Sequence, residues 1–200
     1  SYLHQKSDAG WQVTSFEEAR EKVMQLTSAL VDIKIHYEDK IAIISEAKTD
    51  WIIAEFAALY AGAISVPLSI KLLPEEIPFR INHSDSKLLL ISENTMEKIL
   101  SQGDRFEYKE LKLVVMDLPS TKISALCKQY NFKEADLLFI GDLYKSGKKS
   151  LGKNRALIER TIQMIREDDV VTISYTSGTT GNPKGIMLTH LNYYSNSHAA

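Results

Sequence analysis

Short apolar runs alternate with amphipathic stretches along this chain of 200 residues. Runs rich in Ile, Leu and Val are typical of buried strands, and they occupy residues 40–45, 63–66, 87–92, 111–116 and 170–173. Apolar positions spaced by three or four residues predict helices, here at 16–33 and 51–61 and at about 93–100, 121–131 and 154–165. The alternation predicts a doubly wound α/β fold, with a largely parallel sheet flanked by helices.

Local signals mark several of the predicted boundaries. Ser15 and Glu18 have the spacing of a capping box at the start of the first helix. Thr49 is a candidate N-cap for the second helix, and Gly62 follows its last apolar position. Pro78 lacks the amide hydrogen that a helix interior needs, so we expect a kinked or late-starting helix there.

The segment from Asp136 to Arg155 shows no clear periodicity. Its second half carries two glycines and a run of basic side chains, namely Lys145, Lys148, Lys149, Lys153 and Arg155. Such a run is expected to form a solvated, mobile loop. Contact with a phosphorylated partner is the alternative.

Composition narrows the class of protein without naming a function. Hydrophobic residues make up 44% of the chain and charged residues 25%, which is ordinary for a globular protein. A net charge of −2 gives no reason to expect nucleic acid as a partner, and any membrane association is expected to be peripheral at most. The single cysteine, Cys127, excludes a disulfide framework and is expected to be a buried structural thiol. No apolar run is long enough to span a bilayer, so we expect a cytoplasmic location.

The stretch Tyr175-Thr-Ser-Gly-Thr-Thr-Gly-Asn-Pro-Lys-Gly185 carries the candidate chemistry. Glycines let backbone amides approach a ligand closely, hydroxyls add donors, and Lys184 adds a positive charge. Together these are the parts of a loop that binds a polyphosphate. It is not the common phosphate loop, because Pro183 and not glycine precedes Lys184. A flexible linker is the alternative, and the apolar segments on both sides argue against it.

This stretch, followed by Met187-Leu-Thr-His190, resembles the signature of adenylate-forming enzymes. That superfamily contains acyl-CoA synthetases, luciferases and the adenylation domains of peptide synthetases. Residues 40–68 are similar to a second block of the same family, and the spacing is most like that of long-chain fatty acyl-CoA synthetases. The resemblance implies that residues 1–200 are part of a large N-terminal domain, ending just after the phosphate-binding loop. The rest of that domain and a C-terminal domain would lie outside this chain.

The resemblance also implies a reaction and a set of site residues. MgATP would activate a fatty acid to acyl-AMP, pyrophosphate would leave, and CoA would accept the acyl group. Residues expected to contact the nucleotide are Thr176, Ser177, Gly178, Thr179, Thr180, Gly181 and Lys184. Among these, Lys184 and Thr180 are assigned catalytic roles at the phosphates, and Thr176 is assigned to Mg²⁺ together with a glutamate outside the chain. Tyr175, Pro183 and Gly185 are expected to be structural.

Alternatives remain open at this point. The enzyme could stop at acyl-AMP, load a carrier protein, or act on another acid. A non-enzymatic nucleotide-binding module is the alternative from another class. The expected partners are small molecules (fatty acid, ATP and CoA) and no nucleic acid, and the sequence is compatible with a homodimer of the full-length protein. His190, at the start of a predicted helix, is expected to cap or pack and not to act as a catalyst.

Overall fold

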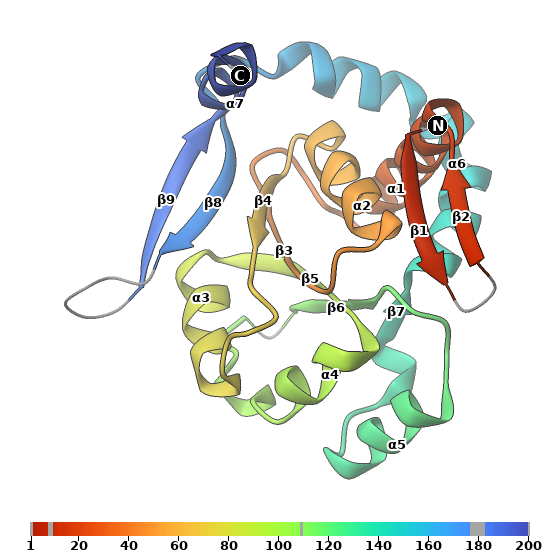
Figure 1. Ribbon diagram of the computed structural model, residues 1–200, viewed down its shortest axis with the longest axis vertical. Coiled ribbons are helices and arrows are strands. Elements are labelled where there is room, and N and C mark those ends of the chain that lie inside the picture. The colour runs from red at the N-terminus through yellow and green to blue at the C-terminus, as the bar shows by residue number, and fades with distance from the viewer. Residues whose placement is uncertain (1, 8–9, 109, 177–182, 200) are drawn as a thin grey trace.

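The computed structural model describes residues 2–7, 10–108, 110–176 and 183–199. Its main sheet has seven strands in the order β7-β6-β5-β3-β4-β8-β9 (Figure 1). The strands are β3 (Lys40–Ile44), β4 (Ile64–Pro67), β5 (Ser86–Ile91), β6 (Lys112–Val115), β7 (Leu137–Phe139), β8 (Val170–Thr176) and β9 (Lys184–Thr189). All neighbouring pairs are parallel except β8 and β9, which are antiparallel. The predicted fold class is therefore confirmed.

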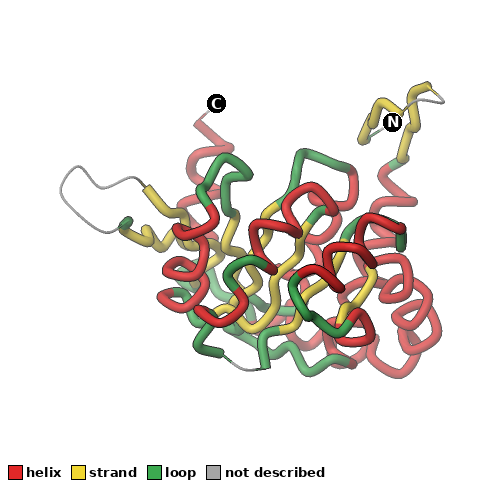
Figure 2. Tube along the Cα trace, turned by 90° about the horizontal axis from the view of Figure 1, so that it is seen from below, coloured by secondary structure: helices red, strands yellow, loops and turns green. Residues whose placement is uncertain are grey.

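Helices cover both faces of this sheet, and the strands lie among them in Figure 2. Their bounds are α1 (Phe16–Asp32), α2 (Thr49–Tyr60), α3 (Ile77–His83), α4 (Glu93–Leu100), α5 (Thr121–Gln129), α6 (Ile140–Met164) and α7 (His190–Ala199). Alternate strand residues point to opposite faces. On β3, Ala42 and Ile44 pack with α3, α4 and α5, whereas Ile41 and Ile43 pack with α1, α2 and α6.

Several boundary predictions are confirmed. The capping box is present, because the Ser15 hydroxyl accepts from the Glu18 amide at 3.1 Å and the Ser15 amide donates to Glu18 Oε2 at 2.7 Å. Helix α3 begins late, after a 3-10 turn over Pro74–Glu76, with Pro78 in its first turn. Cys127 is buried in α5.

In the segment from Asp136 to Arg155, the prediction that the basic run from Lys145 to Arg155 forms a loop was wrong. This segment forms β7 and most of α6, a helix of 25 residues that begins well before the predicted residue 154. A buried polar contact fixes α6 against α1: the Asn154 amide donates to the Ser28 carbonyl at 3.1 Å and to Asp32 Oδ1 at 3.0 Å. The basic side chains occupy the outward face of the helix, where charge is solvated.

The N-cap prediction at Thr49 was also wrong by one residue, and a contact with a distant part of the chain takes the place of the cap. Helix α2 begins at Thr49, and Lys48 occupies the N-cap position without a side-chain cap. The Thr49 amide instead donates to Gln5 Oε1 at 2.8 Å. Gln5 belongs to a separate two-stranded hairpin, β1 (Leu3–Ser7) and β2 (Gly10–Thr14), that the hydrophobic pattern did not predict.

Among the described residues, no helix is both long and apolar enough to cross a membrane.

Candidate functional site

Strands β8 and β9 carry the two ends of the candidate phosphate-binding loop. β-Branched Val170, Val171, Thr172 and Ile173 favour the extended backbone of β8, and β9 returns antiparallel to it. Thr176 pairs directly with Lys184, so the chain enters and leaves the loop about 5 Å apart. The loop begins at the carboxyl end of β8, the edge at which open α/β sheets bind their ligands.

Thr176 and Lys184 share one face of the hairpin because directly paired residues project to the same side. Both side chains are exposed. Among the described residues, the Lys184 ammonium makes no ion pair or hydrogen bond. The structure therefore brings together two of the predicted site residues. The others, Ser177, Gly178, Thr179, Thr180 and Gly181, lie outside the described residues.

Tyr175 and Gly185 form the next pair, on the opposite face of the hairpin. A Cβ on Gly185 would lie 3.0 Å from Ile173 Cγ2 and 3.4 Å from two ring atoms of Tyr175, so a larger residue here would push the Ile173 side chain aside. The Tyr175 hydroxyl donates to the Arg80 carbonyl oxygen at 3.2 Å and lies 2.9 Å from His83 Nδ1. Burial raises the pKa of the Tyr175 phenol. These contacts support the structural roles predicted for Tyr175 and Gly185.

Arg80 and His83 were not among the site residues predicted from the sequence. Both lie on α3, and they meet Tyr175 across more than 90 positions of chain, since His83 and Tyr175 are 92 residues apart. A sequence signal that could have pointed to them is the spacing of a basic and an imidazole side chain three residues apart on a short helix.

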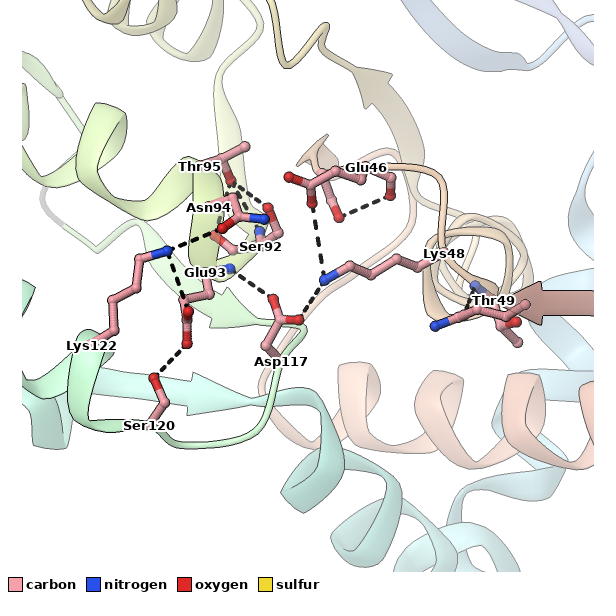
Figure 3. Close-up of polar contacts among 12 residues, drawn as sticks. Glu46, Lys48, Thr49, Ser92, Glu93, Asn94, Thr95, Asp117, Ser120 and Lys122 are labelled. Atoms are coloured by element: carbon pink, nitrogen blue, oxygen red, sulfur yellow. Dashed lines mark hydrogen bonds and ion pairs between the residues drawn. The ribbon is translucent and has the colours of Figure 1, made fainter. Parts of the chain in front are cut away.

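A polar network joins the carboxyl ends of β3, β5 and β6 (Figure 3). Lys48 forms an ion pair with Asp117 and lies 4.0 Å from Glu46 Oε2. Asp117 Oδ2 accepts from the Glu93 amide at 2.7 Å, at the start of α4. At the same end of α4, Lys122 Nζ lies 3.3 Å from Glu93 Oε1. The network ties together loops that share this edge of the sheet.

Glu46 is the member of this network whose environment is least satisfied. Burial opposes its ionisation, but hydrogen bonds from Ser92 and Asn94 and the charge of Lys48 leave its pKa lowered. Within the described residues, its buried Oε2 atom has no hydrogen-bond partner. Three members, Glu46, Glu93 and Asp117, each follow directly on a predicted strand, which is the sequence signal that could have located the network.

Helix α7 begins immediately after β9, and its cap comes from Thr189 and Asn192. The Thr189 hydroxyl accepts from the Asn192 amide at 3.3 Å, and Asn192 Oδ1 accepts from the Thr189 amide at 2.9 Å. The backbone amide of His190 donates to the Asp169 carbonyl at 3.1 Å. The cap therefore comes from Thr189 and Asn192 and not from His190, and the backbone contact of His190 with Asp169 supports a packing role for that residue.

Magnesium was predicted at Thr176. Mg²⁺ takes oxygen ligands and usually combines one or two carboxylates with waters and substrate phosphates. The exposed Thr176 hydroxyl, at the mouth of the loop and beside Lys184, fits one such position. Among the described residues no group of three or more His, Cys, Asp or Glu side chains is placed to hold a metal ion.

The fold and the hairpin define a doubly wound α/β protein that presents a glycine-rich loop at the carboxyl edge of its sheet. The family described as "AMP-binding enzyme" matches residues 3–200, and the chain belongs to that family. This finding confirms the resemblance to adenylate-forming enzymes.

Curated relatives cover nearly the whole chain. The 4-hydroxybutyrate–CoA ligase 2 of Metallosphaera sedula is 31% identical over 90% of this chain and 30% of its own length. Fatty acyl-CoA synthetase A of Dictyostelium discoideum is 30% identical over 95% of this chain and 26% of its own length. This chain thus spans less than a third of the length of these two relatives.

Solved structures agree at the level of fold. The anthranilate–CoA ligase AuaEII in complex with anthranoyl-AMP superposes with a TM-score of 0.72, at 19% identity, over 94% of this chain and 32% of the ligase. The adenylation domain of a carboxylate reductase from Mycobacterium chelonae gives a TM-score of 0.69, at 18% identity, over 94% of this chain and 31% of that domain.

Proposed function

We propose that this chain supplies the triphosphate-binding part of an AMP-forming acid–CoA ligase. A carboxylic acid and ATP would give acyl-AMP and pyrophosphate, and CoA would then displace AMP to give the thioester. The observation that carries the proposal is the pairing of Thr176 with Lys184 at the base of the loop, on the carboxyl edge of a family-matched α/β domain.

The chemistry explains why such a loop is needed. A carboxylate is a poor electrophile, because its leaving group would be oxide, and the mixed anhydride with AMP provides a good leaving group. As the acid attacks the α-phosphorus, negative charge accumulates on the departing pyrophosphate. Donors positioned there in advance stabilise the transition state. Alignment of the two reactants supplies much of the remaining rate enhancement.

The described residues contribute in two ways. Lys184 has an exposed ammonium without a competing ion pair among the described residues, so it is available to the γ-phosphate end. Thr176 would offer its hydroxyl to Mg²⁺, which when bound neutralises phosphate charge. Ser177, Thr179 and Thr180 would donate to the β- and γ-phosphates, as the family resemblance implies.

The acid that we propose as the substrate is a long-chain fatty acid. Fatty acyl-CoA synthetase A and the long-chain-fatty-acid–CoA ligase 6 of Rattus norvegicus, each 30% identical, favour it. The relative named for 4-hydroxybutyrate argues for testing small acids as well. ATP–pyrophosphate exchange by the full-length protein should be measured with a panel from 4-hydroxybutyrate to palmitate. Fastest exchange with the long-chain acids supports the proposal, and preference for 4-hydroxybutyrate would contradict the choice of acid.

The acceptor is tested separately. Supplied acyl-AMP should yield a thioester with CoA, and transfer only to a carrier-protein thiol would identify the alternative ligase. Binding of ATP without any acid-dependent exchange would identify a non-enzymatic nucleotide-binding module.

Several exposed apolar side chains belong to β9 and α7. β9 is the edge strand of the sheet, and α7 follows it (Figure 1). The exposed side chains are Ile186, Met187, Leu191, Tyr193 and Tyr194. We propose that further residues of the same protein cover this surface, as part of one large domain, because patches of this kind mark interfaces. Residues 1–200 would then form one wall of the site. The 200-residue chain alone should catalyse no exchange, and measurable exchange by it would contradict this division.

A further inference from the structure

Tyr175 links helix α3 to the base of the loop by hydrogen bonds. It directly precedes Thr176, and its half-buried ring packs against the core on the α3 side of the sheet. Its hydroxyl meets two groups of α3: the Arg80 carbonyl oxygen at 3.2 Å and His83 Nδ1 at 2.9 Å. The orientation of the phenol therefore couples the end of β8 to α3.

The hydrogen bonds run in one direction. A phenol has a single proton to donate, and Tyr175 donates it to the Arg80 carbonyl. With this assignment, the proton between His83 and Tyr175, whose atoms lie 2.9 Å apart, comes from Nδ1 of the imidazole. The chain of donors is His83 to Tyr175 to Arg80, and it requires His83 to carry hydrogen on Nδ1.

Arg80 and His83, the two α3 residues of this hydrogen-bond chain, make further contacts of their own. The buried Arg80 side chain donates from Nη1 to the Glu76 carbonyl at 2.7 Å, and its Nη2 lies 3.5 Å from Glu76 Oε1. The His83 ring stacks on Phe79 with a centroid distance of 5.3 Å. The Arg80 guanidinium lies 5.9 Å from the centre of the Tyr175 ring, which adds a cation–π contact.

The same ring lies beside the strand that leaves the loop. Tyr175 pairs with Gly185 across the hairpin, and a Cβ on Gly185 would stand 3.4 Å from the ring atoms Cε1 and Cζ. Tyr175 is therefore tied to α3 by its hydroxyl and paired with the β9 residue that follows Lys184.

We propose that Tyr175 and His83 are positioning residues: their hydrogen-bond chain from α3 holds the base of the loop so that Thr176 and Lys184 meet the triphosphate. The catalytic part of this inference rests on the proposed function. Displacement of a binding group by even 1 Å can lower a rate by about a hundredfold, so an anchor of this kind is expected to affect ATP use.

The catalytic test compares four variants of the full-length protein in acid-dependent ATP–pyrophosphate exchange. Tyr175→Phe removes the hydroxyl, His83→Ala removes the donor, and His83→Asn restores an N–H donor near the position of Nδ1. Tyr130→Phe is the matched control, because Tyr130 also donates between elements, to Glu97 at 3.1 Å, but at the end of α5 remote from the loop.

Tyr175→Phe and His83→Ala should raise KM for ATP about tenfold, the effect of losing one well-placed hydrogen bond. KM for the acid should stay unchanged, and His83→Asn should return KM for ATP to within about threefold of wild type. A merely structural role would instead lower the amount of folded enzyme without this selective effect. An ATP KM for Tyr175→Phe within about twofold of Tyr130→Phe, or no rescue by His83→Asn, would overturn the proposal.

Two further readouts do not require activity. Imidazole ¹⁵N spectra at about pH 8.5, where a histidine is ordinarily neutral, should show the Nδ1–H tautomer of His83. Amide hydrogen exchange at Thr176 and Lys184 should be faster in Tyr175→Phe than in Tyr130→Phe. An Nε2–H tautomer or unchanged amide exchange would overturn the inference. Absence of acid-dependent exchange in the wild type would refute the proposed function alone.

Discussion

Gly147 on α6 lies directly against the backbone of Gln25 on α1. A Cβ at Gly147 would stand 1.8 Å from the Gln25 carbonyl oxygen, far inside van der Waals contact. The oxygen belongs to a helix backbone, which cannot move aside as a flexible side chain can. The two helices therefore approach as closely as they do only because residue 147 has no side chain.

Gly147→Ala should destabilise the protein by about 3 kcal/mol or more, because α6 must move away from α1 and lose buried contacts. Gly152→Ala on the same helix should stabilise it by about 0.5–1 kcal/mol, because Gly152 is exposed with open space around it. Denaturant unfolding of both variants tests this pair. Equal effects of the two substitutions would contradict the helix contact.

Gly147 and Gly152 also explain why the sequence predicted a loop where the structure has helix α6. Two glycines and a run of lysines favour a loop in any reading of local propensity. The helix forms because its buried face, which includes Leu143, Asn154 and Ile158, packs on α1. One of the two glycines serves that contact. Tertiary packing outweighed local propensity, and this contact was not visible in the sequence.

Tyr37 and Asp169 should give the protein a recognisable pH dependence. The Tyr37 hydroxyl donates to Asp169 Oδ2, which also accepts from the Arg166 amide at 2.7 Å. The hydrogen bond from Tyr37, followed by that from the Arg166 backbone, lowers the pKa of Asp169 below its ordinary 3.8. The bond to Asp169, together with burial, raises the pKa of Tyr37 from 10.0 to about 12.

Tyr37→Phe should therefore reduce the free energy of unfolding by a constant amount between about pH 5 and pH 9. The difference from wild type should shrink as pH rises from 10.0 to about 12, because a group with a raised folded pKa loses its stabilising effect there. It should also shrink as pH falls below 3.8, because the lowered folded pKa of Asp169 is passed in that range. Urea unfolding of both proteins across pH measures the difference. A difference that does not vary with pH would contradict the pairing.

The ion pair of Lys48 with Asp117 should stabilise the fold more than an exposed surface ion pair does. Both side chains are about three-quarters buried, and Asp117 also holds the first amide of α4. A double-mutant cycle with alanine at both positions should give a coupling of about 1–3 kcal/mol. The exposed pair of Lys145 with Asp142 is the control, with an expected coupling of about 0.5 kcal/mol or less. Equal couplings would mean that the network at the sheet edge adds little stability.

The sequence located the loop and its flanking strands because both signals are local. A glycine- and hydroxyl-rich stretch between β-branched runs can be recognised without knowledge of the rest of the chain. The hydrogen bonds that anchor the loop could not be predicted in this way. His83 and Arg80 reach Tyr175 only after β4 and β8 pair, and Gln5 caps α2 only after the hairpin packs on it.

Lys184 provides the most direct test of the account, because its charge should act at the departing pyrophosphate and not at the thioester step. Lys184→Ala in the full-length protein should lower acid-dependent ATP–pyrophosphate exchange by about 10²–10³-fold. Thioester formation from supplied acyl-AMP should change by less than about threefold, as should both half-reactions in Lys149→Ala, an exposed lysine on α6. The measurement is the ratio of the two half-reaction rates in Lys184→Ala relative to wild type. A fall in the adenylation rate alone is the predicted result, and equal losses in both half-reactions would contradict the role assigned to the loop.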